Sequence, residues 1–169
     1  IKVPVKYPEY LTCNPLERYF GRKMLFNGIV LAQAIITALG CMFYVGMQSV
    51  NPLLLILACC ICSLNFMAMN YALVYALDNI GMAIAVIIMV IQVAGSGGSY
   101  PVHVLPEFFQ KLYNFMPFHY GMDMIRETIG GFYGHTYLRC AVILLLMCVG
   151  FAIFGLLVYY PAKPLNRLI

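Results

Sequence analysis

The sequence predicts an all-α integral membrane domain with four transmembrane helices and an extracellular re-entrant, amphipathic helical hairpin between the third and the fourth. The first observation is composition: 63% of the 169 residues are hydrophobic and only 9% are charged, whereas about a quarter of a soluble domain is charged. The second is the succession of long apolar runs separated by polar links. The third is the placement of basic residues, which gather beside the first and last apolar runs.

The N-terminal part is polar, and the first span follows it. Residues 1–24 contain three prolines and five basic residues, and we expect them to form a cytoplasmic segment. The run 25–47 has no charge and exceeds the roughly 20 helical residues that cross a bilayer core. This run is the first predicted span. Because the chain begins with Ile1 rather than Met, we expect it to be processed or to be part of a longer protein.

The next two apolar runs, about 53–77 and 80–98, are joined by Asp78-Asn79, which predicts a tight turn. Polar residues within these runs are costly in lipid unless they face protein or water. They form either hydrogen bonds between helices or part of a substrate path. The polar residues are Asn65, Asn70 and Gln92. The third run reaches the length of a span only through small residues, before a proline stops it; these residues are Gly95, Gly97, Gly98 and Pro101.

The segment between the third and fourth runs contains a predicted helical hairpin at about 103–131. Apolar residues recur at helical spacing between 104 and 116, with polar residues on the other face. Such an amphipathic helix suits the membrane interface. Pro117 interrupts it, and a second short helix over about 119–129 ends at a pair of glycines. The candidate residues of the hairpin are Phe108, Phe109, Pro117, Tyr120, Asp123, Arg126 and Glu127.

The hairpin residues allow two interpretations. Asp123, Arg126 and Glu127 lie on one helical face at spacings of three and four, which predicts a local ion-pair network. Alternatively, Arg126 contacts lipid headgroups or substrate from a hairpin that dips into the membrane. Phe108 and Phe109 are expected to pack against the outer ends of the third and fourth spans and to cap a central path.

The sequence carries no recognisable catalytic or cofactor motif. The three histidines are spaced too widely for a compact metal site. A metal cluster at Cys59, Cys60 and Cys62 is the alternative to ordinary buried thiols, but no His or carboxylate lies nearby. No phosphate-binding loop is present, so this chain is not expected to hydrolyse ATP. We expect no enzyme activity, no catalytic residues, no cofactor and no bound metal.

The fourth span is predicted at about 140–160, and 161–169 forms a cytoplasmic tail. Seven of the ten basic residues lie in the two terminal segments, and such segments stay on the cytoplasmic side. The whole segment 103–139, which contains the hairpin, is balanced in charge, with three basic and three acidic residues. We therefore place both termini in the cytoplasm, the hairpin outside the cell and the protein in the plasma membrane. Orientation accounts for the net charge of +4, and no nucleic-acid partner is expected.

One stretch resembles a known family. The run QVAGSGGSYPVHVLPEFFQKLYNFMPFHYGMDMIRETIGG, with NPLLL after the first span, resembles the last outer segment of the YhgE/Pip (phage infection protein) family. That family is similar to the type-2 class of ABC exporter permeases. The resemblance covers about residues 25–165. The matching positions are Gly95 to Gly98, Pro101, Leu105-Pro106, Phe108-Phe109, Pro117-Phe118, Tyr120, Arg126-Glu127 and Gly130-Gly131.

The resemblance implies a permease unit of six spans with a large extracellular domain after the first, of which this chain would hold the last four. It implies movement of a hydrophobic or amphipathic substrate or polymer, a homodimer or heterodimer in the bilayer, and an ATPase supplied by a separate subunit. The alternative is the membrane anchor of a cell-surface phage receptor or of a type VII secretion-associated scaffold protein. An intramembrane enzyme ranks third, because few polar residues face each other across the spans.

Overall fold

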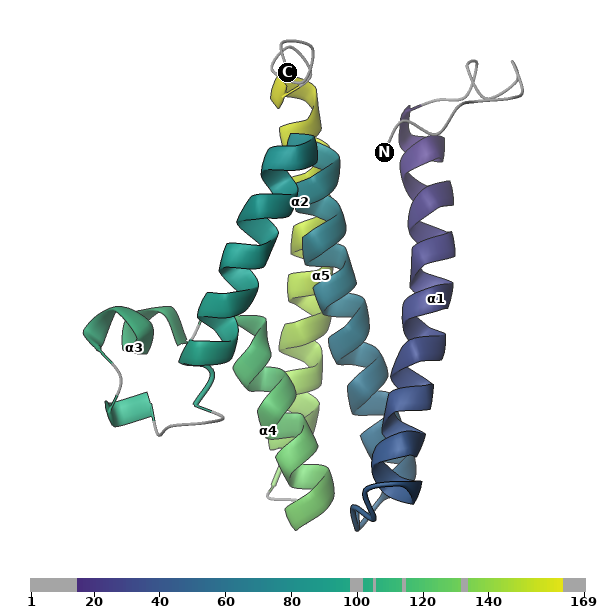
Figure 1. Cartoon of the computed structure of the whole chain (residues 1–169), viewed down its shortest axis with the longest axis vertical. Helices are drawn as coiled ribbons and strands as arrows, with labels where there is room; N and C mark the ends of the chain where they lie inside the picture. The colour runs from purple at the N-terminus through teal and green to yellow at the C-terminus, as the bar shows by residue number, and fades with distance from the viewer. Residues whose placement is uncertain (1–14, 98–101, 105, 114, 132–133, 163–169) are drawn as a thin grey trace.

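The computed structural model describes residues 15–97, 102–104, 106–113, 115–131 and 134–162 (Figure 1). Every regular element in these ranges is a helix, so the predicted all-α fold is confirmed there. The elements are α1 (Pro15–Phe43), α2 (Pro52–Gly95), the 3-10 helix η2 (Val102–Val104), α3 (Glu107–Tyr113), α4 (Pro117–Gly130) and α5 (Thr136–Ala162).

Three stretches are long and apolar enough to cross a membrane. They are Gly21–Phe43 in α1, Pro52–Leu77 in α2 and Thr136–Val158 in α5. The second part of α2, Asn79–Gly95, is a shorter apolar helix. In Figure 1, α1 begins and α5 ends at the upper end of the bundle, which we call the terminal end; the lower end is the opposite end.

Helix α2 reverses direction near its middle. Its 44 residues would extend about 66 Å as a straight helix, about twice the thickness of a bilayer core. Figure 1 shows instead two arms that meet at the terminal end. A Cβ on Gly81 would overlap the backbone carbonyl of Leu73, although residues that far apart on a straight helix are separated by about 12 Å. The predicted turn at Asp78-Asn79 falls at this corner, and the missing side chain of Gly81 lets the arms approach.

The core lies where α2, α4 and α5 meet. Helix α5 packs along α2, and α4 packs against both. A Cβ on Gly155 of α5 would lie only 2.9 Å from the Cα of Ala72 on α2. In lipid, such close backbone packing is a main source of helix association, because lipid chains are as apolar as the side chains. The buried cluster shared by the three helices contains Ala58, Met124, Cys140 and Leu144.

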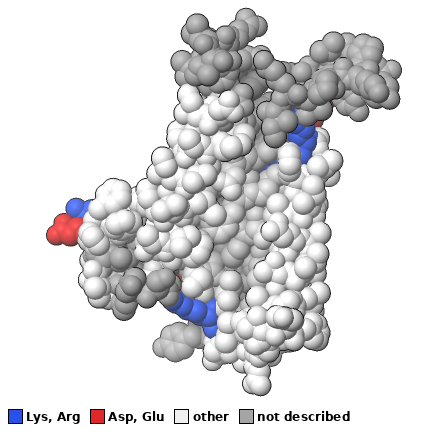
Figure 2. All heavy atoms as spheres, viewed as in Figure 1, with Lys and Arg blue, Asp and Glu red and all other residues white. Residues whose placement is uncertain are grey.

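The outer surface of the bundle is apolar. Met24, Leu53 and Leu146 are large hydrophobic residues that are 76%, 81% and 67% exposed. On the face drawn in Figure 2, the charged side chains lie toward the two ends and on the projecting α3, with an uncharged surface between them. Water would solvate such a continuous apolar surface poorly, whereas lipid covers it. The protein is therefore a multi-pass membrane protein.

Helix α1 differs from the predicted first span at both ends. It starts at Pro15 and ends at Phe43, whereas the apolar run predicts 25–47. Proline is favourable in the first turn, where its missing N–H has no helical partner. Tyr19 is fully buried, so packing extends the helix into the charged segment. In the link to α2, Gly46 has a φ of 72°, which suits glycine after a helix.

The third predicted span also ends early. Helix α2 stops at Gly95 rather than at residue 98. Gly97 has a φ of 70°, a conformation that ends a helix and favours glycine. The candidate residues Gly98 and Pro101 lie outside the described residues.

The single amphipathic helix predicted over 104–116 is wrong in its extent. Val102–Val104 form a separate 3-10 turn, and α3 covers only Glu107–Tyr113, with none of its residues buried. Pro106 explains the break, because proline disfavours helical conformation in the residue before it. The second predicted helix is close to the observed α4, which begins with Pro117 at its first position.

Candidate functional site

A buried amide connects the first arm of α2 to α5. Asn65 is 1% exposed, and its Nδ2 donates a hydrogen bond of 2.5 Å to the carbonyl oxygen of Leu144. Its Oδ1 has no partner among the described residues. The contact that this residue makes is therefore a hydrogen bond between helices, with one acceptor left over in the interior.

A second buried amide lies on the other arm of α2. Gln92 is also 1% exposed, and its Nε2 donates to Sδ of Met69 on the first arm at 3.3 Å. Its Oε1 is unpartnered in the described part of the chain. Met69 lies one turn from Asn65 on the same face of the first arm, so the structure places Gln92 about one helical turn from Asn65 in the interior. Asn70, which is half-buried, lies on another side of that arm.

Helix α4 is a short helix packed among longer ones. Its 14 residues extend about 21 Å, too little to cross a bilayer core. In Figure 1 it lies beside the bundle toward the opposite end. A Cβ on Gly121 would lie 2.7 Å from Sγ of Cys62 on α2, and Met124 is fully buried. Pro117, at the start of α4, is buried as well. The helix thus packs against the first arm of α2 and against α5 toward the opposite end.

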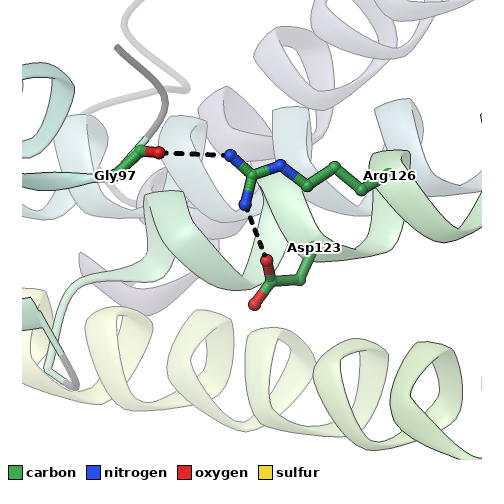
Figure 3. Close-up of polar contacts among 3 residues, drawn as sticks. All are labelled: Gly97, Asp123 and Arg126. Carbon is green, nitrogen blue, oxygen red and sulfur yellow. Dashed lines mark hydrogen bonds and ion pairs between the residues drawn. The ribbon is translucent and has the colours of Figure 1, made fainter. Parts of the chain in front are cut away.

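Arg126 joins α4 to the far end of α2. Figure 3 shows its guanidinium between two partners: Nη2 donates to the carbonyl of Gly97 at 3.2 Å, and Nη1 lies 3.4 Å from Oδ1 of Asp123. Carbonyls at the C-terminal end of a helix lack helical partners, and a positive charge there is favourable. The predicted pair of Asp123 and Arg126 is present. Glu127 does not join it, and its Oε2 is buried without a partner among the described residues.

His119 holds the corner between α3 and α4. Its ring is 5% exposed, stacks on Tyr113 with ring centroids 4.1 Å apart, and lies 3.7 Å from the ring of Tyr120. Nδ1 has no partner in the described structure. Burial lowers the pKa of the imidazole, and the nearby charge of Asp123 opposes that shift only in part. The imidazole is therefore neutral near pH 7.

One of the two predicted capping rings meets a span. A Cβ on Gly95 would lie 3.1 Å from Cδ1 of Phe109, so the glycine leaves room for that ring at the end of α2. Phe108 touches Phe109 edge-on, with centroids 5.5 Å apart, and is 62% exposed. Consecutive residues on a helix point about 100° apart, so α3 cannot turn both rings toward the bundle.

Two hydrogen bonds tie the opposite end together. The backbone N–H of Val50, in the link between α1 and α2, donates to the carbonyl of Thr128 on α4 at 3.0 Å. The hydroxyl of Tyr137 on α5 donates to the carbonyl of Leu54 on α2 at 2.9 Å. The Val50 bond and the Arg126 contact thus fix α4 to the α1–α2 link and to the end of α2, while the Tyr137 bond joins α5 to α2.

An aromatic cluster at the terminal end was not predicted from the sequence. The ring of Tyr19 lies 5.1 Å from that of Tyr71 and 4.8 Å from that of Tyr75, and Phe26 adjoins Tyr71 at 6.0 Å. The hydroxyl of Tyr71 donates to the carbonyl of Tyr19 at 3.2 Å, and the hydroxyl of Tyr19 donates to that of Ala152 on α5 at 3.5 Å. We call these four rings the terminal aromatic cluster. The spacing of four between Tyr71 and Tyr75 was the available signal.

Metal-ligating side chains are dispersed in the described ranges. No group of three or more His, Cys, Asp or Glu there is arranged to hold a metal ion. The cysteines in those ranges are free thiols, including Cys59, Cys60 and Cys62.

Comparison with known proteins places this arrangement in a family. The uncharacterized protein YhgE of Bacillus subtilis (strain 168) is 28% identical over 142 residues, which are 83% of this chain and 18% of that protein. No solved structure matches the chain. The pattern that defines the ABC-2 type transporter matches residues 10–129, which include α1, α2, α3 and most of α4. The resemblance to YhgE/Pip-like permeases is thereby confirmed. Proteins with this domain are membrane transport components that work with a separate ATPase, and the chain belongs to the ABC-2 type transporter family.

Proposed function

We propose that the chain is the membrane domain of a YhgE/Pip-like permease that moves a hydrophobic or amphipathic substrate or polymer, driven by an ATPase on another chain. The observation that carries this proposal is the pair of buried amides inside the bundle. Asn65 and Gln92 are both buried, and each keeps an amide oxygen without a partner among the described residues. Polar groups within a membrane interior are costly unless they face protein or water, and unpartnered amide oxygens facing the interior could line a substrate path.

In this proposal α4 closes the opposite end of the path, and Arg126 holds it against the end of α2. The opposite end and the hairpin face outward, and both termini lie in the cytoplasm of a plasma-membrane protein. The ATPase docks at the terminal end, near the corner of α2. The working unit is a homodimer or heterodimer, so that the interior of one copy is completed by its partner.

The first experiment measures transport by the whole protein purified from its own membranes with its ATPase. We expect ATP-dependent movement of a fluorescent amphipathic probe in proteoliposomes. Arg126→Gln should raise passive leak of the probe, because α4 loses its charged contact with Gly97. Lys111→Gln is the matched control, since it removes one positive charge from the exposed α3. Absence of ATP-dependent movement, together with unchanged leak in folded Arg126→Gln, would contradict the proposal.

The second experiment locates the ATPase. On a cysteine-free background, Asn79→Cys places a thiol at the exposed corner of α2, and His135→Cys places one at an exposed position of the opposite end. We expect crosslinking to the ATPase from position 79 and not from position 135. Crosslinking from position 135 alone would reverse the proposed arrangement.

A membrane anchor for a cell-surface phage receptor or a type VII secretion-associated scaffold is the second candidate. It is favoured by one observation: the chain corresponds to only 18% of YhgE, so most of that relative lies beyond the matched part. If the chain is an anchor, position 79 should not crosslink to an ATPase. It also tolerates apolar replacements of Asn65 and Gln92 without loss of surface function, which distinguishes it from a permease.

A further inference from the structure

Lys23 lies on the inner face of α1. That face is marked by Tyr19, which is fully buried, and by Ala34 and Ala38, which are 4% and 2% exposed. Lys23 follows Tyr19 by one turn on this face and is partly buried, whereas its neighbour Arg22 is exposed. The candidate span of α1 begins at Gly21, so this ammonium sits within its first turn. An ionisable side chain turned inward near the end of a span is a candidate for a binding site.

Aromatic rings from two helices form a floor beneath the ammonium. Nζ of Lys23 lies 5.8 Å from the centroid of the Tyr19 ring, within the range of a cation–π contact. The Tyr19 ring is in turn packed against Tyr71 and Tyr75 of α2. The ring beneath the ammonium is therefore held by packing between two helices.

The positive charge at this site is not neutralised within the described structure. Ion pairs there join Lys111 to Glu107 and Arg126 to Asp123. Neither Arg22 nor Lys23 has a carboxylate partner among the described residues. Two adjacent cations beside an aromatic floor are suited to an anion. Basic pockets between transmembrane helices characteristically bind the phosphate headgroups of lipids.

The surface beyond the two cations indicates an amphipathic ligand. Met24, Leu25 and Ile29 follow directly along α1 and are 76%, 64% and 56% exposed. An acyl chain gains from lying along such a stripe, whereas a free phosphate ion does not. We propose that Arg22 and Lys23, which lie beside the terminal aromatic cluster, bind the phosphate headgroup of an anionic lipid, whose acyl chain lies along α1. This site rests on its own geometry and does not depend on the transport proposal.

The test uses the whole protein in nanodiscs of phosphatidylcholine, with phosphatidylglycerol as the added ligand. Affinity is measured from lipid retained in native mass spectrometry and from the rise in melting temperature. We expect Arg22→Gln and Lys23→Gln each to weaken phosphatidylglycerol binding about fivefold. Lys23→Arg should retain it, and Lys111→Gln is the matched control for the loss of one charge. Inorganic phosphate at the same concentration should not displace the lipid.

Several results would overturn the inference. One is a folded Lys23→Gln protein that binds phosphatidylglycerol as the parent does, even if its orientation in cells is altered; the two cations would then serve topology only. Another is an equal loss in Lys111→Gln, which would indicate a general charge effect. Displacement of the lipid by inorganic phosphate would indicate that the site binds a soluble anion rather than a lipid. If Lys23→Gln does not fold, Arg22→Gln decides the question, because that side chain is exposed.

Discussion

At the scale of one residue, replacing Asn65 should affect transport far more than stability. The carbonyl that it contacts belongs to Leu144 within α5, and a carbonyl inside a helix already accepts a helical hydrogen bond. We therefore predict that Asn65→Leu changes the free energy of unfolding in detergent by less than about 1 kcal/mol. ATP-dependent transport should nevertheless be lost, because the interior loses a polar group. Asn70→Leu, on another side of the same arm, is the control and should retain transport. A strong loss of stability with intact transport would make Asn65 structural.

His119 gives the hairpin a dependence on pH. Burial lowers its folded pKa, and this shift is opposed only in part by backbone interactions with Met116 and Tyr113 and by the charge of Asp123. The ring of Tyr113 stacks on the imidazole from α3. In the unfolded chain the imidazole takes up a proton with the ordinary histidine pKa of about 6.5. The folded state binds that proton less readily, so stability is complete above this pH and falls as the pH is lowered through the folded pKa.

We predict that the melting temperature of the parent falls between neutral and mildly acidic pH. His119→Gln should show a flatter pH dependence, measured by thermal unfolding in detergent. His103→Gln, at an exposed position in η2, is the control and should keep the slope of the parent. Equal slopes for the parent and His119→Gln would assign the pH dependence to other groups.

At the scale of elements, α5 and α2 approach most closely at Gly155. A Cβ there would meet the Cα of Ala72 at 2.9 Å, and backbone atoms cannot move aside as a flexible side chain can. We predict that Gly155→Ala destabilises the fold by about 1–3 kcal/mol, as overpacking does. Gly150→Ala, on the same helix with nothing within 4 Å, should be neutral or stabilising by up to about 1 kcal/mol. Unfolding in detergent measures both, and equal effects would refute the close approach.

For the whole molecule, the proposed orientation can be read by labelling. On a cysteine-free background, Gln110→Cys lies on exposed α3 and Asn79→Cys lies at the terminal corner. We predict that an impermeant maleimide labels position 110 in intact cells and position 79 only after permeabilisation. The charge distribution supports this outcome, because basic flanks remain in the cytoplasm. Labelling of position 79 alone in intact cells would invert the topology.

The sequence predicts those features that lipid imposes directly. Apolar runs locate the spans, because the backbone must be satisfied within a helix in the bilayer core, and helical spacing predicts the pair of Asp123 and Arg126. The start of α1 is different. The charges up to Lys23 predict that the first span begins after them, whereas the helix starts earlier because Tyr19 is buried against rings that are distant in the sequence. The contact between Gln92 and Met69 likewise depends on how the two arms of α2 pack after the predicted turn, and no local spacing encodes that packing.

The hydrogen bonds that fix α4 can form only late in biosynthesis. The N–H of Val50 and the carbonyl of Gly97 are both synthesised before their partners on α4, Thr128 and Arg126. Until α4 leaves the ribosome, water or the insertion machinery must satisfy these groups. A nascent chain that ends before Pro117 contains α1, α2 and α3 but lacks the contacts of α4 at the opposite end of the bundle. During that interval the N–H of Val50 and the carbonyl of Gly97 lack the partners that they have in the finished chain.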